Sequence, residues 1–144
     1  LDAVEGDWIA EHDIGIALAD VQAALKALDP GLANAIAARA SRLKETDAAK
    51  RLQLCAEQLA VGERLALEYE YLAGVESPAS AQSARMNMQV EKLSARMSTG
   101  QTLAPREQRS ALDLRWWAMG PLSTDDRQRL NERRERAVAA LDGR

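Results

Sequence analysis

Residues 47–78, DAAKRLQLCAEQLAVGERLALEYEYLAGVESP, decide the fold class of this chain. Small and apolar side chains recur there every three or four residues, which is the period of one face of an α-helix. The series runs through Leu52, Cys55, Leu59, Gly62, Ala66, Tyr69 and Ala73. The stretch therefore predicts a long helix whose seam packs on another helix, and Gly62 predicts a close approach between the two.

Capping residues, glycine and proline mark the ends of this helix. Thr46 or Asp47 begins it, and Gly74 ends it in the left-handed conformation. Ser77-Pro78 begins the next helix after a short turn. That helix carries a matching apolar stripe at Met86, Val90, Leu93 and Met97. We therefore predict that the two helices form a long central α-hairpin.

Similar signals predict helices on both sides of the hairpin. Breaks fall at Asp29-Pro30-Gly31, Ser98-Thr99-Gly100, Pro105 and Gly120-Pro121, and Ser123 or Thr124 caps a last helix. No window alternates apolar and polar residues as a strand does. The sequence thus predicts an all-α fold, an irregular bundle of about six helices. Residues 1–46 form an N-terminal helical segment and residues 47–144 the main helical region, together one compact domain.

Composition narrows the class of protein. The chain has 144 residues and a formal net charge of −3, and its only cysteine is Cys55. A single cysteine excludes an internal disulfide and fits a reducing, cytoplasmic compartment, so we expect Cys55 to be a small core residue. No apolar run is long enough to cross a membrane. The chain opens with Leu1 rather than Met, so we expect it to be a piece of a longer protein.

The residues that carry chemistry do not form a recognisable site. His12 is the only histidine, and one histidine with one cysteine cannot supply the usual zinc ligands. The phosphate-binding glycine motifs are absent. Glu68 and Glu70 are two residues apart, so they diverge around a helix. We therefore predict no catalytic residue, no metal, no cofactor and no enzymatic activity.

Arginines concentrate in the last predicted helix. They are Arg127, Arg129, Arg133, Arg134 and Arg136. Glu132 and Glu135 are interleaved with them, and no aromatic residue lies among them to stack on bases. The favoured interpretation is a solvated helix face. The alternative is a contact with protein or nucleic acid.

Two stretches together resemble a known bacterial family. One runs from Leu52 through Tyr71–Ala79 to Arg85–Leu93, and the other comprises Leu112, Arg115-Trp116, Met119-Gly120-Pro121, Leu130, Arg133 and Ala137. The pattern, which covers roughly residues 50–140, resembles the domain of unknown function 349 family, whose hallmark is a Trp three residues before a hydrophobic-Gly-Pro. The resemblance implies a helix-rich bacterial protein that carries the domain in tandem and has no established enzymatic activity. Arg134 stands where the family usually has an aromatic residue, and Asn131 where it often has a large apolar residue or Trp. We therefore expect the last helix to be less deeply buried or to pack against something outside this sequence.

The two adjacent tryptophans receive different predictions. Trp116 shares a helix face with Leu112 and Met119, so we expect it to be buried between the 50–73 helix and the last helix, beside the turn of Gly120-Pro121. Trp117 points elsewhere, either over a neighbouring helix or outward as an interaction residue. We therefore predict a non-enzymatic interaction or scaffold module that binds a protein partner or neighbouring copies. The alternative is a nucleic-acid-associated domain that uses the C-terminal arginines.

Overall fold

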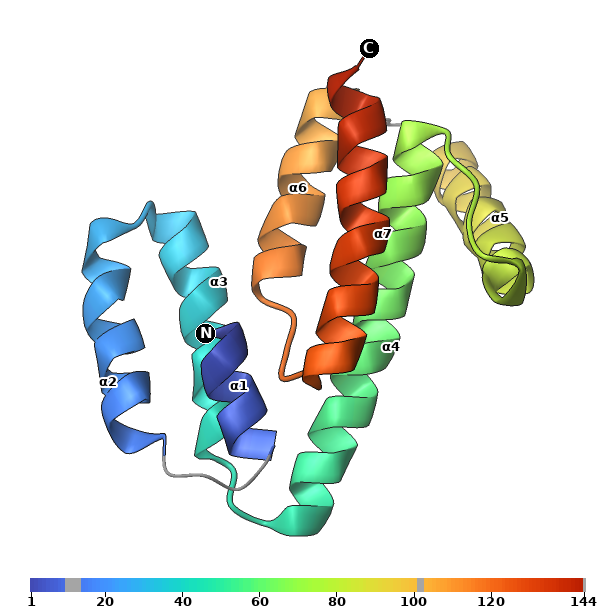
Figure 1. The fold of residues 1–144 in the computed structure, drawn as a ribbon. Helices are drawn as coiled ribbons and strands as arrows, with labels where there is room; N and C mark the ends of the chain where they lie inside the picture. Colours follow the sequence, from blue (N-terminus) through green and yellow to red (C-terminus); the bar gives the residue numbers. More distant parts are fainter. Residues whose placement is uncertain (10–13, 101–102, 144) are drawn as a thin grey trace.

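The computed structural model describes residues 1–9, 14–100 and 103–143, and within these ranges it contains seven α-helices and no strand (Figure 1). The helices are α1 (Asp2–Ile9), α2 (Gly15–Ala24), α3 (Pro30–Ser41), α4 (Ala48–Ala73), α5 (Gln82–Thr99), α6 (Pro105–Trp117) and α7 (Thr124–Asp142). Short 3-10 turns follow α2 at Leu25–Ala27 and α3 at Arg42–Lys44, and a third precedes α5 at Ala79–Ala81. The all-α fold class is confirmed. No break between α1 and α2 was predicted from the sequence, which accounts for the additional helix.

Most helix ends lie where the sequence predicts them. The Asp29 carboxylate accepts a hydrogen bond from the backbone N–H of Gly31 at 3.1 Å, and Asp47, rather than Thr46, accepts one from Lys50 at 3.1 Å. Gly74 ends α4 with φ 70°, a conformation that favours glycine. The Ser123 hydroxyl accepts from Asp126 at the start of α7. Each of these groups satisfies backbone atoms that a helix end leaves unpaired.

The main core lies where α4, α6 and α7 pack side by side (Figure 1). Its largest members are Leu65 and Tyr69 from α4, Trp116 from α6 and Leu130 from α7. Gly62 permits the close approach that the sequence predicts, because a Cβ there would lie 2.7 Å from Cδ1 of Leu130. The helix that approaches is α7, whereas we expected it to be α5.

The N-terminal helices form a second, smaller core. Val4 and Trp8 from α1 pack with Leu43, and the Trp8 indole donates a hydrogen bond to the backbone oxygen of Glu45 at 3.2 Å. Cys55 is half-buried beside this core, and burial raises the pKa of its thiol. Helix α1 contacts α7, and α3 contacts α6. The N-terminal helices are therefore joined to the main core on two sides.

Helix α5 is the most peripheral element of the C-terminal region and is inclined to α4 (Figure 1). Two ion pairs connect the helices: Arg64 with Glu91 at 3.0 Å, and Lys92 with Glu68 at 3.2 Å. Met88 is the buried residue of α5. The chain does turn back between α4 and α5, but the central packing partners of α4 are α6 and α7.

Candidate functional site

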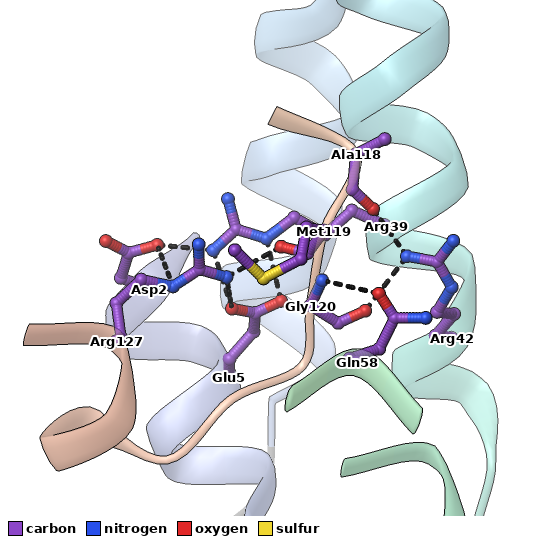
Figure 2. Close-up of polar contacts among 9 residues, drawn as sticks. All are labelled: Asp2, Glu5, Arg39, Arg42, Gln58, Ala118, Met119, Gly120 and Arg127. Carbon is purple, nitrogen blue, oxygen red and sulfur yellow. Dashed lines mark hydrogen bonds and ion pairs between the residues drawn. The ribbon is translucent and has the colours of Figure 1, made fainter. Parts of the chain in front are cut away.

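The segment between α6 and α7 is surrounded by a cluster of four charged side chains, three of them buried (Figure 2). We call Asp2, Glu5, Arg39 and Arg127 the Gly120 cluster, because the last three lie around that glycine and Asp2 pairs with both arginines. Arg39 donates to the two carboxylate oxygens of Glu5, from Nε at 2.8 Å and from Nη2 at 2.6 Å. Arg127 donates to Glu5 at 3.3 Å and to the backbone oxygen of Met119 at 2.7 Å. Residues distant in sequence are thereby brought together from α1, α3 and α7.

Two further side chains hold the backbone of this segment. Gln58 of α4 accepts a hydrogen bond from the Gly120 N–H at 3.0 Å. Arg42 donates to the backbone oxygens of Ala118 and Gly120 at 2.5 and 2.9 Å (Figure 2). Gly120 has φ +148° and precedes a cis peptide bond to Pro121. A Cβ at Gly120 would lie 2.3 Å from Glu5 Oε2, so only glycine fits this position.

The charges within the Gly120 cluster neutralise one another. Burial acts to raise the pKa of Asp2, but the hydrogen bond and charge of Arg39 outweigh it and lower the pKa. For Arg127, burial and the neighbouring charge of Arg39 lower the pKa. Two carboxylates thus face two guanidinium groups, and Glu5 is saturated by its arginine donors. This arrangement stabilises the junction between helices and leaves no carboxylate of the cluster poised for acid–base chemistry.

A second buried ion pair joins α4 to α7. Arg133 donates to both oxygens of Glu70, at 3.0 and 2.6 Å, and to Glu63 at 2.8 Å. The Ser77 hydroxyl donates to Glu70 at 2.8 Å, and Arg85 donates to that hydroxyl at 3.0 Å. Glu70 is therefore saturated, as Glu5 is. Glu68 points to another side of α4, as predicted, and pairs with Lys92 and with Arg115 at 2.9 Å.

The expected solvated arginine face on α7 is wrong for three of its five residues. Arg127 and Arg133 are buried in the ion pairs described above. Arg134 is partly buried, with its guanidinium 5.1 Å from the ring centre of Tyr69 and 5.4 Å from that of Trp116, and it pairs with Asp113 at 3.1 Å. Arg129 and Arg136 are exposed, and Arg129 pairs with Glu63 at 2.6 Å. Arg127, Arg133 and Arg134 leave the solvent because acidic partners on α1, α4 and α6, respectively, face them. Leu130 and Ala137 of the last helix have no exposed surface.

Trp116 lies where the sequence predicts it. Its ring is buried and meets Tyr69 edge-on, at 6.0 Å between ring centres and 85° between planes. The Arg134 guanidinium of α7 also lies over the Trp116 ring, and Met119 and Pro121 are buried nearby in the chain. Trp117 is 41% exposed. The Trp116–Pro121 segment is therefore a structural junction, and Trp117 lies at the surface.

The α5 apolar face, formed by Met86, Val90, Leu93 and Met97, is the main correction to the sequence analysis. We expected this stripe in the core, yet its four side chains are between 54 and 79% exposed. At about 100° per residue, Met88 lies on the opposite side of α5 from the stripe, so the apolar face points away from the molecule. Leu52, which we placed on the seam of α4, is exposed as well. The predicted helical spacing of these residues was correct. The prediction that they pack against another helix of the chain was wrong.

A cleft of about 370 Å³ lies on the inner side of α5, between α4 and α6. Its charged lining consists of Glu68 with Lys92, Arg96 and Arg115. Glu68 is already paired with two of these cations. Within the described residues, no group of three or more His, Cys, Asp or Glu side chains is placed to hold a metal ion. His12 lies outside the described residues.

No helix in the described ranges has the length and apolarity needed to cross a membrane. Comparison with known proteins found no matching family model, no matching curated protein and no matching solved structure. The resemblance to the domain of unknown function 349 family therefore stays a prediction.

Proposed function

We propose that this chain is a non-enzymatic helical interaction module that binds a helix of a protein partner through the α5 apolar face. The observation that carries the proposal is the outward direction of Met86, Val90, Leu93 and Met97. A row of large apolar side chains at helical spacing is the surface that a helix uses to pack against another helix. Contiguous exposed apolar surface is uncommon on soluble proteins and marks interaction sites.

The buried charged groups support a scaffold rather than an enzyme. Glu5, Glu68 and Glu70 are each neutralised by basic partners within the chain. Catalytic carboxylates need a free lone pair or proton directed at a substrate. The same ion pairs connect α1, α3, α4 and α7, which suits a rigid support for an exposed helix. We include in this proposal that the protein is bacterial and cytoplasmic and belongs to the domain of unknown function 349 family.

Few arginine side chains of α7 are free to bind nucleic acid, which was the alternative function. Of the five arginines on α7, only Arg129 and Arg136 are exposed, and Arg129 is paired with Glu63. Proteins that bind nucleic acid use several unneutralised Lys or Arg side chains to contact phosphates. Arg109 and Arg115 also have acidic partners, Asp142 and Glu68. Protein binding is therefore the function that we favour.

Site-specific photo-crosslinking in cells that express the protein at its native level tests the proposal. A photoreactive residue is placed at position 93 on α5 and, as the matched control, at the exposed position Gln22 on α2. We expect covalent protein adducts from position 93 and none from position 22. Equal yields at the two positions, or no adduct at 93, would contradict an interaction through α5.

A further inference from the structure

The α5 apolar face reads the same from either end of the helix. Its residues are separated by four, three and four positions, so the pattern is symmetric about a point between Glu91 and Lys92. A helix turned end over end therefore presents the same stripe. A two-fold interface requires this property, because both subunits must use one self-complementary patch.

We propose that the partner of the α5 apolar face is α5 of a second copy of this chain, packed antiparallel to the first. This inference rests on the proposed function and names its partner. In the symmetric register, Met86 faces the partner's Met97, and Val90 faces the partner's Leu93. The four-three-four spacing is also that of the apolar positions along the seam of a coiled coil.

Charges along α5 are compatible with this pairing. The border of the stripe is lined with uncharged polar residues: Gln82, Ser83, Asn87, Gln89 and Ser94. Arg96 is the charged residue nearest the stripe, and the symmetric antiparallel register places it on the same side as the partner's Gln89. Glu91 and Lys92 flank the symmetry axis but are held towards α4 by Arg64 and Glu68. No like charges therefore oppose one another, and like-charge contacts would otherwise select against a second copy.

The position of α5 leaves room for a second copy. The helix lies at an edge of the molecule (Figure 1), and the face opposite the buried Met88 is exposed. An interface of four apolar side chains from each copy is small compared with that of a permanent dimer. We therefore expect a reversible dimer whose proportion rises with protein concentration.

Sedimentation equilibrium over a range of concentrations tests for the dimer. The variant Val90→Ser with Leu93→Ser should be monomeric where the wild type is mostly dimeric. The matched control is Leu52→Ser with Ile16→Ser, which removes two side chains that are 74% and 84% exposed elsewhere. It should dimerise as the wild type does. A wild type that is monomeric throughout, or a dimer that both double variants weaken equally, would overturn the inference.

Disulfide trapping tests the antiparallel register. In a Cys55→Ala background, one chain carries Met86→Cys and another, of different mass, carries Met97→Cys. The antiparallel register brings these two cysteines together, whereas two copies of either one lie about 16 Å apart along the helix axis, too far for a disulfide. Mixed disulfides on gentle oxidation support the proposal. Disulfides between like chains, or none at concentrations where the dimer forms, would overturn it.

Mass spectrometry of the position-93 adducts separates the two proposals. Adducts between two copies of this chain support both. Adducts with only a different protein would overturn the second-copy inference and leave the proposed function standing. An absence of adducts at position 93 would overturn both.

Discussion

Helix α7 is rich in charged residues and lies in the core, whereas helix α5 has an apolar face that is exposed to solvent. Ten of the 19 residues of α7 are charged, yet α7 lies in the main core between α4 and α6. Helix α5 carries four large apolar side chains on one face, and that face is exposed at the edge. The difference arises from the residues that each helix meets elsewhere in the chain. Acidic side chains on α1 and α4 neutralise the buried arginines of α7, whereas no described element covers the α5 apolar face.

The hydrophobicity of a helix is therefore a poor guide to its depth in this fold. Arg133 is buried because Glu70 and Glu63 receive its hydrogen bonds. A buried ion pair of this kind depends on both members, since either one alone would be an uncompensated charge. The apolar face of an amphipathic helix, in contrast, can pack against any apolar surface. Its sequence does not indicate whether that surface belongs to the same chain or to a partner.

The largest expected effect tests the core around α7. Trp116→Ala should lower the free energy of unfolding by about 3–5 kcal/mol, because it removes a buried ring that packs on Tyr69 and Arg134. The neighbouring substitution Trp117→Ala should cost about 1 kcal/mol or less, since that side chain is at the surface. Urea denaturation of both variants measures the difference. Equal losses would contradict the placement of Trp116 in the core.

The buried ion pair of α7 should rank next. Glu70→Ala leaves Arg133 buried without its main partner, which typically costs about 3–5 kcal/mol. We expect the lower end of that range, because Glu63 still accepts a hydrogen bond from Arg133. Glu91→Ala on α5 is the control, since it breaks an exposed pair with Arg64 worth about 0–1 kcal/mol. If both substitutions have the same small effect on urea denaturation, the polar residues of α7 do not support its burial.

The helical character of the chain and most helix ends could be predicted from the sequence. Caps such as Asp29 and Asp47 and the left-handed Gly74 act within a few residues, so their signals are local. The Gly120 cluster could not be found in this way, because Glu5 and Arg127 are 122 positions apart. The local sequence did not single out Glu5, because a second acidic residue, Asp7, lies with it between Val4 and Trp8. The burial of three α7 arginines depends on the same kind of distant partner.

A smaller, pH-dependent effect is expected at Tyr69, which links α4 to α6. Burial, followed by the hydrogen bond to Asp113, raises the pKa of the Tyr69 phenol far above its usual value of 10.0. Above about pH 10 the unfolded chain would lose a proton that the folded chain keeps, so stability falls as pH rises towards the folded-state pKa. Tyr69→Phe should cost about 1–2 kcal/mol at pH 7 and should lessen this alkaline loss. Denaturation at pH 7 to 11 checks both effects, with Tyr71→Phe as the control. An equally steep alkaline loss in Tyr69→Phe would contradict the role of the phenol.

The smallest expected effect lies on α5, where the same substitution can be compared with one in the core. Leu65→Ala on α4 should cost about 2–5 kcal/mol, because Leu65 is completely buried and its loss leaves a cavity. Leu93→Ala on α5 should cost about 0.5 kcal/mol or less, since most of that side chain is already in water. Both variants are compared by urea denaturation at a dilution where the protein is monomeric, so that contacts between copies do not contribute. A small cost at Leu93 would mean that the α5 apolar face is dispensable for folding of the isolated chain, and that a loss of binding in α5 variants reports on the interface. If Leu93→Ala were as costly as Leu65→Ala, the face would be covered within the monomer, and both proposals for α5 would lose their basis.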